Sequence, residues 1–249
     1  MLVAFNWKMN PASLAEAHAI ADVVKKASVK AKGVESVIIP PAVFLPTLAS
    51  THRAQGIHFG VQNIHTEQGG AFTGDISAIQ AKDAGASYAL VGHAERRKVG
   101  ETNDDVHKKV LAAIASGLAP IICIGESARD HSGEYLEFIK SQLSVALADV
   151  SKSHMKKVVI AYEPVWAIGA TEPMKPEHMH EMTIFIRKIL WEKYEKAGRA
   201  VPILYGGAIL NAEHAVEMAK ESEVDGFLLG RLSIDSEKLP TIFESLSDL

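Results

Sequence analysis

The most constraining feature of this chain is a regular alternation of short apolar runs and longer amphipathic segments along all of its 249 residues. The apolar runs are rich in Val, Ile and Tyr and are continuously apolar, which is typical of parallel strands buried on both faces. We expect strands at 2–7, 36–39, 58–61, 88–91, 119–124, 158–162, 201–205 and 226–229. We expect helices at 13–32, 45–54, 76–84, 104–116, 135–150, 176–196, 212–220 and 238–246.

Several helix ends carry their own signals. Ser13 lies just before an apolar-periodic run and Glu16 follows three residues later, which predicts a capping box. Pro176 is suited to the first position of its helix. Glycine is the residue that most readily takes the left-handed conformation after a helix, and we expect that conformation at Gly33, Gly85, Gly117 and Gly198.

Eight strand–helix units with right-handed crossovers predict an α/β protein whose fold is a closed (β/α)₈ barrel. The alternative is a doubly wound open sheet. However, no Gly-x-Gly-x-x-Gly segment follows a strand, and the units continue evenly toward residue 249. No linker-like or low-complexity stretch divides the sequence, so we expect one barrel domain over 1–249.

Composition limits the classes of function. The net charge is −4 with both signs interspersed, which argues against a nucleic-acid-binding protein. The only cysteine, Cys123, excludes an internal disulfide and a cysteine zinc cluster, and we expect it to be a core residue of the fifth strand. No apolar run approaches the roughly 20 residues that a membrane span needs, and no signal-peptide pattern opens the chain. We therefore expect a cytoplasmic protein with no membrane partner.

Three strings place reactive groups where a predicted strand ends. Asn6 and Lys8 end the first strand, His93 follows the fourth, and Glu163 follows the sixth. Active sites of such barrels lie at the carboxyl ends of the strands, so the fold would gather these groups. A fixed cation, an imidazole and a carboxylate are the parts needed to move a proton beside a polarised carbonyl.

Each of these residues also has a purely structural interpretation. Glu163 could be an ion-paired carboxylate at the rim, His93 a histidine satisfied by backbone groups, and Lys8 a lysine that extends to solvent. A short helix starting at His93 would disfavour an added proton and keep its imidazole neutral. We expect Glu95 and the arginines that follow it to form a supporting ion-pair network. His178 and His180 point to different faces of one helix, so we expect no metal site.

Glycines after three adjacent strands predict an anion site. They follow strands six, seven and eight, and such loops let backbone N–H groups approach a phosphate. Taken alone, each is an ordinary turn signal. The candidate positions are Gly169, Gly206-Gly207-Ala208 and Gly230-Arg231.

Taken together, the motifs resemble the triosephosphate isomerase family over essentially the full length. The strings that carry the resemblance are Phe5-Asn6-Trp7-Lys8-Met9-Asn10, Gln62-Asn63, Gly70-Ala71-Phe72-Thr73-Gly74, Gly92-His93-Ala94-Glu95-Arg96-Arg97, Cys123-Ile124-Gly125-Glu126, Ala161-Tyr162-Glu163-Pro164-Val165-Trp166-Ala167-Ile168-Gly169 and Tyr205-Gly206-Gly207. The resemblance implies interconversion of dihydroxyacetone phosphate and D-glyceraldehyde 3-phosphate without a cofactor, in glycolysis and gluconeogenesis.

The resemblance also implies a role for each matching residue. Glu163 would be the base, and His93 the neutral electrophile, a pairing for which this family is itself the standard illustration. Lys8 and Asn6 would steady the enediolate, with Glu95 supporting Lys8. The substrate phosphate would be held by the backbone groups of Gly169, Ala208, Gly230 and Arg231.

Two further segments receive roles from the resemblance. The loop that continues from Pro164 would be a lid that excludes water. The segment 68–73, including Thr73, resembles a loop that reaches into a neighbouring subunit, so a homodimer is implied. Taken alone, this segment is equally an ordinary mobile connection.

Four departures from the family pattern concern the lid and the phosphate site. Ala94 and Ala208 replace usual serines, the segment 170–174 differs from the usual Thr-Gly-Lys-Thr-Ala, and Arg231 replaces a glycine. Our hypothesis is that these changes alter lid closure more than proton transfer. The alternatives left open are a barrel that acts on another sugar phosphate and a catalytically silent barrel.

Overall fold

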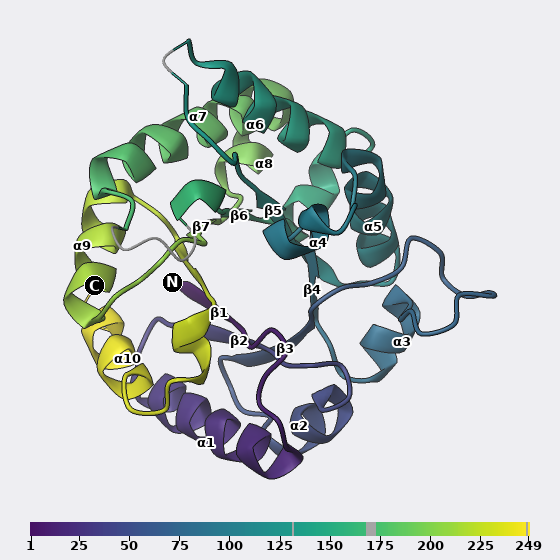
Figure 1. Ribbon diagram of the computed structural model, residues 1–249, viewed down its shortest axis with the longest axis vertical. Coiled ribbons are helices and arrows are strands. Elements are labelled where there is room, and N and C mark those ends of the chain that lie inside the picture. Colours follow the sequence, from purple (N-terminus) through teal and green to yellow (C-terminus); the bar gives the residue numbers. More distant parts are fainter. Residues whose placement is uncertain (131, 168–172, 248) are drawn as a thin grey trace.

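Eight parallel strands close into a barrel in sequence order, each paired with its neighbours and the last with the first. Figure 1 shows this barrel ringed by helices. The computed structural model describes residues 1–130, 132–167, 173–247 and 249. The strands are β1 (Leu2–Asn6), β2 (Glu35–Ile39), β3 (Ile57–Val61), β4 (Tyr88–Val91), β5 (Ala119–Ile124), β6 (Val159–Tyr162), β7 (Ile203–Tyr205) and β8 (Gly226–Leu229). The predicted (β/α)₈ fold is confirmed.

The helices also follow the predicted pattern, with short additions. The α-helices are α1 (Leu14–Lys30), α2 (Leu45–Thr51), α3 (Ala78–Asp83), α4 (Ala94–Lys98), α5 (Asn103–Ala115), α6 (Glu134–Ala146), α7 (Pro176–Tyr194), α8 (Lys196–Arg199), α9 (Ala212–Ser222) and α10 (Leu239–Ser247). The 3₁₀ helices are η1 (Lys152–Lys157), η2 (Val165–Ala167) and η3 (Arg231–Ile234). The short helix expected at His93 is α4. The sequence analysis did not foresee α8 or the 3₁₀ turns.

Two separate apolar layers explain why the strands are apolar on both faces. One layer fills the barrel and includes Leu2, Ala4 and Cys123, whereas the other lies between strands and helices and includes Val3 and Phe5. Successive residues of a strand point to opposite faces, so each strand contributes to both layers. Cys123 is fully buried in the inner layer, as expected.

The predicted helix ends are correct except at two positions, since the capping box at Ser13 is only half formed and Gly198 lacks a positive φ. The Ser13 hydroxyl accepts the Glu16 N–H at 3.2 Å, while the Glu16 carboxylate accepts the N–H of Ala12 rather than that of Ser13. Gly33, Gly85 and Gly117 all have positive φ. Gly198 does not, and its prediction is wrong. It lies within α8, where a Cβ would be 2.1 Å from the Leu190 carbonyl oxygen, so glycine is required for close packing.

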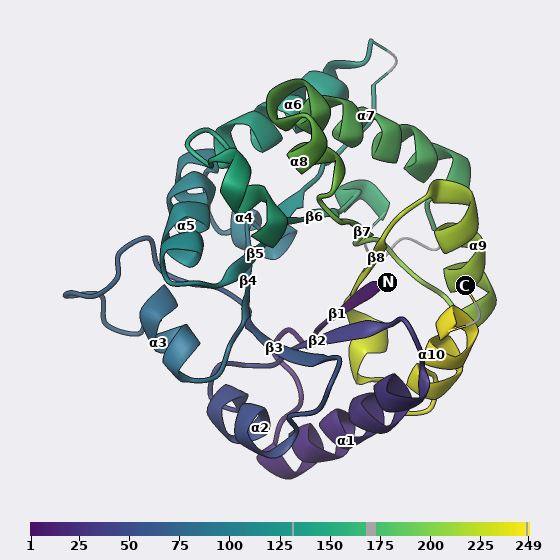
Figure 2. The ribbon, with the colours of Figure 1, turned by 180° about the vertical axis from the view of Figure 1, so that it is seen from behind.

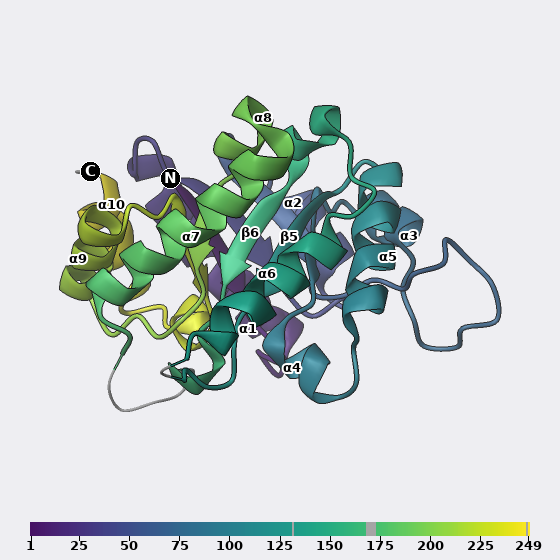
Figure 3. The same cartoon turned by 90° about the horizontal axis from the view of Figure 1, so that it is seen from above.

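The two ends of the barrel differ in their loops. Figure 3 shows α4 at the end where the strands finish and the chain termini at the opposite end. The connection between β3 and α3 projects far from the body of the protein in Figures 1 and 2. Within the described ranges, no helix combines the length and apolar composition needed to cross a lipid bilayer.

A buried ion pair fastens α5 to the strand ends. Lys109 Nζ lies 2.6 Å from Glu101 Oε2 and donates to Asn63 Oδ1 at 2.7 Å, and the side chains of Lys109 and Glu101 are 8% and 3% exposed. The other Glu101 oxygen accepts the Gly92 N–H at 2.8 Å. The pair therefore links α5 to the loops after β3 and β4, next to His93.

We predict that Lys109→Met strongly destabilises the protein, because buried Glu101 would lose its 2.6 Å partner and keep only the longer, 3.6 Å contact with the half-exposed Arg96. Breaking a buried pair in this way typically costs about 3–5 kcal/mol. Urea denaturation of native and variant chains would measure the loss. Lys108→Met is the matched control, because Lys108 pairs with Asp104 at an exposed position and its replacement should matter little. Equal midpoints for Lys109→Met and the native chain would contradict the prediction.

Candidate active site

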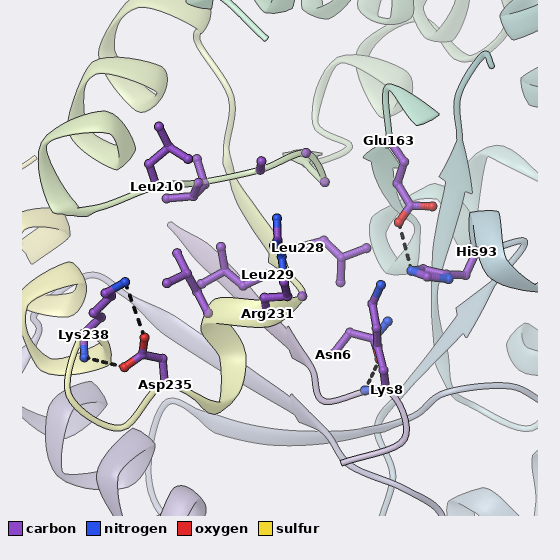
Figure 4. Close-up of a pocket in the computed structure, with 16 residues that line it drawn as sticks. Asn6, Lys8, His93, Glu163, Leu210, Leu228, Leu229, Arg231, Asp235 and Lys238 are labelled. Atoms are coloured by element: carbon purple, nitrogen blue, oxygen red, sulfur yellow. Dashed lines mark hydrogen bonds and ion pairs between the residues drawn. The ribbon is translucent and has the colours of Figure 1, made fainter. Parts of the chain in front are cut away.

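The predicted reactive residues meet in one cavity at the carboxyl ends of the strands. Its volume is about 360 Å³. Figure 4 shows Asn6, Lys8, His93 and Glu163 along one side of it, contributed by the end of β1 and by the segments that follow β1, β4 and β6. The barrel thus brings together residues from Asn6 to Glu163, which are 157 positions apart in the sequence.

Glu163 directly follows β6 and its side chain is 4% exposed. Its Oε1 lies 3.1 Å from His93 Nε2, and its Oε2 accepts the Ala94 N–H at 3.0 Å. Its own N–H donates to the Ile124 carbonyl at 2.8 Å. The carboxylate is therefore held against the start of α4 by two polar contacts, both on the side facing His93.

Two glycines give the Glu163 segment its room. A Cβ at Gly125 would lie 1.8 Å from the Glu163 carbonyl oxygen, and a Cβ at Gly206 would lie 2.8 Å from Glu163 Cγ. Neither distance is compatible with a larger residue unless the backbone moves. The sequence analysis quoted both glycines without assigning them this role. Their positions just after β5 and β7, the neighbours of β6, were the available signal.

His93 is the N-cap of α4. Its Nδ1 accepts the Glu95 N–H at 3.2 Å, which leaves the proton on Nε2, where it is donated to Glu163. Burial lowers the pKa of His93, but the Glu163 carboxylate raises it more, so the net pKa is above the ordinary value of 6.5. The Glu163 carboxylate thus opposes the effect expected of the helix start on the His93 pKa, while the hydrogen bond accepted by Nδ1 matches a neutral ring with its proton on Nε2.

Lys8 has a strained backbone. Its φ is +54°, unusual for a residue with a long side chain. The Gln62 amide donates to the Lys8 carbonyl at 2.6 Å and the Asn6 Oδ1 accepts the Lys8 N–H at 3.1 Å, which together fix this conformation. Gln62 was quoted in the sequence analysis without a role. Such strain persists where surrounding structure enforces it, which is common at functional sites.

The ammonium group of Lys8 is held by Glu95. Lys8 Nζ lies 2.6 Å from Glu95 Oε1. Burial raises the pKa of Glu95, but the hydrogen bond and charge of Lys8 lower it more, so the net pKa is below its usual range. Glu95 thus stands beside Lys8 as the sequence analysis expected.

The rest of the expected ion-pair network is only partly correct. Arg96 Nε lies 3.6 Å from Glu101 Oε2. Arg97 instead donates to the Gly92 carbonyl at 2.8 Å, to Asn103 Oδ1 at 2.7 Å and to the Cys123 carbonyl at 3.3 Å. Arg97 therefore fixes the backbone around His93, where carbonyl acceptors could not be read from the sequence.

A second buried carboxylate, Glu126, anchors the segment after Glu163. It accepts hydrogen bonds from the Tyr162 hydroxyl at 2.7 Å, from Trp166 Nε1 at 2.8 Å and from Arg129 Nε at 3.0 Å. Burial and the Glu126 charge raise the pKa of Tyr162, so its hydroxyl stays a donor. This cluster was not predicted from the sequence. An acidic residue two positions after an apolar strand was the only signal for it.

The predicted phosphate positions lie at the other side of the same cavity. Ala208, Gly230 and Arg231 line it together with Leu210, Leu228 and Leu229. A Cβ at Gly230 would lie 3.4 Å from Lys8 Cε, so the loop after β8 borders the Lys8 side chain. Gly169, the fourth predicted phosphate position, lies outside the described residues, as do residues 170–172 of the altered lid.

The described part of the chain holds no group of three or more His, Cys, Asp or Glu side chains placed to bind a metal ion. Cys123 lies beneath the site, where burial and then the Glu163 charge raise the pKa of its thiol. A protonated, buried thiol is a poor nucleophile. The groups that face the cavity can bind an anion and exchange a proton.

Comparisons with known proteins identify relatives of this chain. The sequence model of the triosephosphate isomerase family matches residues 1–246. The triosephosphate isomerase of Endomicrobium trichonymphae is 38% identical over 238 residues, which cover 95% of this chain and 94% of that protein. The crystal structure of triosephosphate isomerase from Bartonella henselae superposes with a TM-score of 0.85 at 33% identity and covers 98% of both chains.

We predict that Glu163→Gln lowers the pKa of His93. Without this carboxylate, burial and the Lys8 charge continue to lower that pKa, and only the weaker influence of Glu95 still raises it. NMR titration of the imidazole in native and variant chains would measure the shift. In the native chain, the raised His93 pKa stabilises the folded state. This stabilisation is complete at pH values below the His93 pKa in the unfolded chain, about 6.5, and is lost as the pH rises through the higher His93 pKa of the folded chain. An unchanged or higher His93 pKa in the variant would contradict this assignment.

Proposed function

The chain belongs to the triosephosphate isomerase family, and from this premise we propose that it interconverts dihydroxyacetone phosphate and D-glyceraldehyde 3-phosphate in glycolysis and gluconeogenesis. One observation carries the proposal. A carboxylate, an imidazole and an ammonium group from three distant strand ends face one small cavity. The reaction needs a base, a polarising donor and a cation at adjacent carbons, and no cofactor enters this proposal.

Glu163 is the proposed base that carries a proton between the two carbons. In the present arrangement its carboxylate is bonded to His93 and to the Ala94 N–H, so it must turn away from α4 to reach a substrate. Ala94 offers only its N–H to the resting carboxylate, whereas a serine would add a hydroxyl. A neutral hydrogen bond is worth about 0.5–1.5 kcal/mol, so its lack favours departure of the carboxylate.

His93 is the proposed electrophile, donating from Nε2 to the substrate oxygens. When Glu163 turns to the substrate, the influence that raises the His93 pKa weakens, and burial and Lys8 continue to lower it. The start of α4 acts in the same direction. A neutral imidazole with its proton on Nε2 then faces the substrate carbonyl. The movement of Glu163 away from His93 thus favours the neutral form of His93.

Lys8 and Asn6 are the proposed stabilisers of the enediolate. Asn6 is 4% exposed at the cavity edge, and its Oδ1 is already used by the Lys8 N–H, which leaves its amide donors free to face the cavity. The ammonium group of Lys8 opposes negative charge that develops on the substrate oxygens. Glu95 positions that ammonium group through their 2.6 Å contact.

The substrate phosphate is assigned to the side of the cavity formed after β7 and β8. The backbone N–H groups of Ala208, Gly230 and Arg231, together with that of Gly169, are the proposed ligands. Arg231 opens η3, and the first N–H groups of a helix have no partner within the helix. This arrangement would leave the carbon chain of a triose phosphate between the phosphate loops and Glu163.

We also propose a homodimer and a cytoplasmic location. The connection between β3 and α3 that contains Thr73 is exposed from position 67 to 75 and projects from the barrel (Figure 1). Phe72 in this connection is 42% exposed and Met9, in the loop after β1, is 95% exposed. Apolar side chains presented in this way favour contact with a second copy. The location rests on the glycolytic reaction.

Replacement of the base tests the proposed function. Glu163→Gln should reduce turnover of glyceraldehyde 3-phosphate about 10²- to 10⁴-fold in a coupled assay, since proton transfer by a positioned base contributes that much. Glu181→Gln is the matched control, because Glu181 is an exposed carboxylate of α7 outside the cavity. Equal turnover by Glu163→Gln and the native chain would remove Glu163 as the base. A native chain without turnover would favour the silent barrel.

The dimer has a separate test. Thr73→Arg should shift the chain from dimer to monomer in analytical ultracentrifugation, because a buried unpaired cation opposes association. Ser153→Arg, on exposed η1 away from the loop, should leave the dimer intact. A native chain that sediments as a monomer would contradict the proposal.

A further inference from the structure

The guanidinium of Arg231 occupies an unusual place for an exposed cation. Figure 4 shows its side chain in the middle of the cavity, between the Glu163–His93 pair and the Asp235–Lys238 pair. Across the described ranges, this guanidinium makes no hydrogen bond, ion pair or aromatic contact. By contrast, Arg129 and Arg97, also near the site, are each fixed by several acceptors.

Among the Lys and Arg side chains that line the cavity, Arg231 alone has no acidic partner within the described residues. Lys8 is paired with Glu95 at 2.6 Å, and Lys238 lies 3.7 Å from Asp235 Oδ2. Beside these charged groups, the buried apolar side chains of Leu228 and Leu229 also line the cavity. Apolar walls exclude water and lower the effective dielectric, so an anion near the guanidinium would interact with it more strongly than at an open surface.

We propose that the Arg231 side chain is itself a ligand of the substrate phosphate, in addition to the backbone N–H groups of its loop. This inference rests on the proposed function, which places a phosphate at this side of the cavity. The guanidinium presents a planar fork of N–H donors that matches two phosphate oxygens at once. The residue that departs from the family pattern would thus supply a contact rather than only replace a small residue.

The contact should change binding more than turnover. The phosphate is remote from the carbons that exchange a proton, and its charge is the same in the substrate and in the transition state. An interaction made equally in both states lowers KM without raising kcat. If Arg231 instead shaped the side of the cavity that contains Glu163 and His93, its replacement would lower kcat.

The proposal is tested with Arg231→Gln and Arg231→Lys, each compared with the native chain. Calorimetric titration with glycerol 3-phosphate and with inorganic phosphate should show roughly ten- to hundredfold weaker binding by Arg231→Gln, the range for a lost charged hydrogen bond. Arg231→Lys should fall between the two, because it keeps the charge and loses the fork. In the isomerase assay, Arg231→Gln should raise KM by a similar factor with kcat nearly unchanged.

Lys238→Gln is the matched control, because it removes one positive charge from the same cavity at a residue already paired with Asp235. It should weaken binding much less than Arg231→Gln does. Equal losses of affinity in the two variants would indicate that the summed positive charge of the cavity, and not a direct contact with Arg231, attracts the phosphate. That result would contradict the proposal, and so would native-like binding by Arg231→Gln. The titrations need no turnover. A native chain that binds both probes through Arg231 but fails to isomerise would refute the proposed function alone, and a native chain that binds neither probe would refute the contact.

Discussion

Closure of eight parallel strands into one barrel is the constraint on which the site depends. Closure forces alternate residues of every strand inward, so the inner layer that contains Leu2, Ala4 and Ala161 ends in whatever residue comes next in the same register. For β1 that residue is Asn6 and for β6 it is Glu163. The carboxylate and the amide therefore reach the cavity without any special local structure, and a shift of one position in either strand would turn them toward the helices.

The sequence predicted the elements well because strand periodicity and caps are local signals. The eight strands and the cap at Ser13 are examples. Convergence of Lys8, His93 and Glu163 could be predicted too, because topology fixes where strand ends meet. The misses have a common cause, since each depends on which groups the folded chain brings into contact rather than on a local sequence pattern. Gly198 packs on Leu190. The other missed contacts are Glu101 with Lys109, Glu126 with Trp166, and Arg97 with backbone carbonyls.

The resting contact between Glu163 and His93 links the position of one group to the protonation of the other. While the carboxylate lies against Nε2, it favours an added proton on the ring. An added proton would have to go to Nδ1, which already accepts the Glu95 N–H. In this arrangement the Glu163 charge therefore favours protonation of the His93 ring, whereas the hydrogen bond from the Glu95 N–H favours the neutral ring. Departure of the carboxylate ends the conflict in favour of the neutral tautomer, which is the form that the proposed chemistry uses.

The left-handed backbone of Lys8 has an evolutionary consequence. Glycine or asparagine would tolerate φ of +54° with less strain, so selection for a more stable barrel alone would replace this lysine. Gln62 holds the strained conformation in place, as expected at a position where the proposed function of Lys8 is kept at the expense of stability. Directed evolution for heat resistance without a screen for turnover would therefore be expected to replace the proposed catalytic cation early.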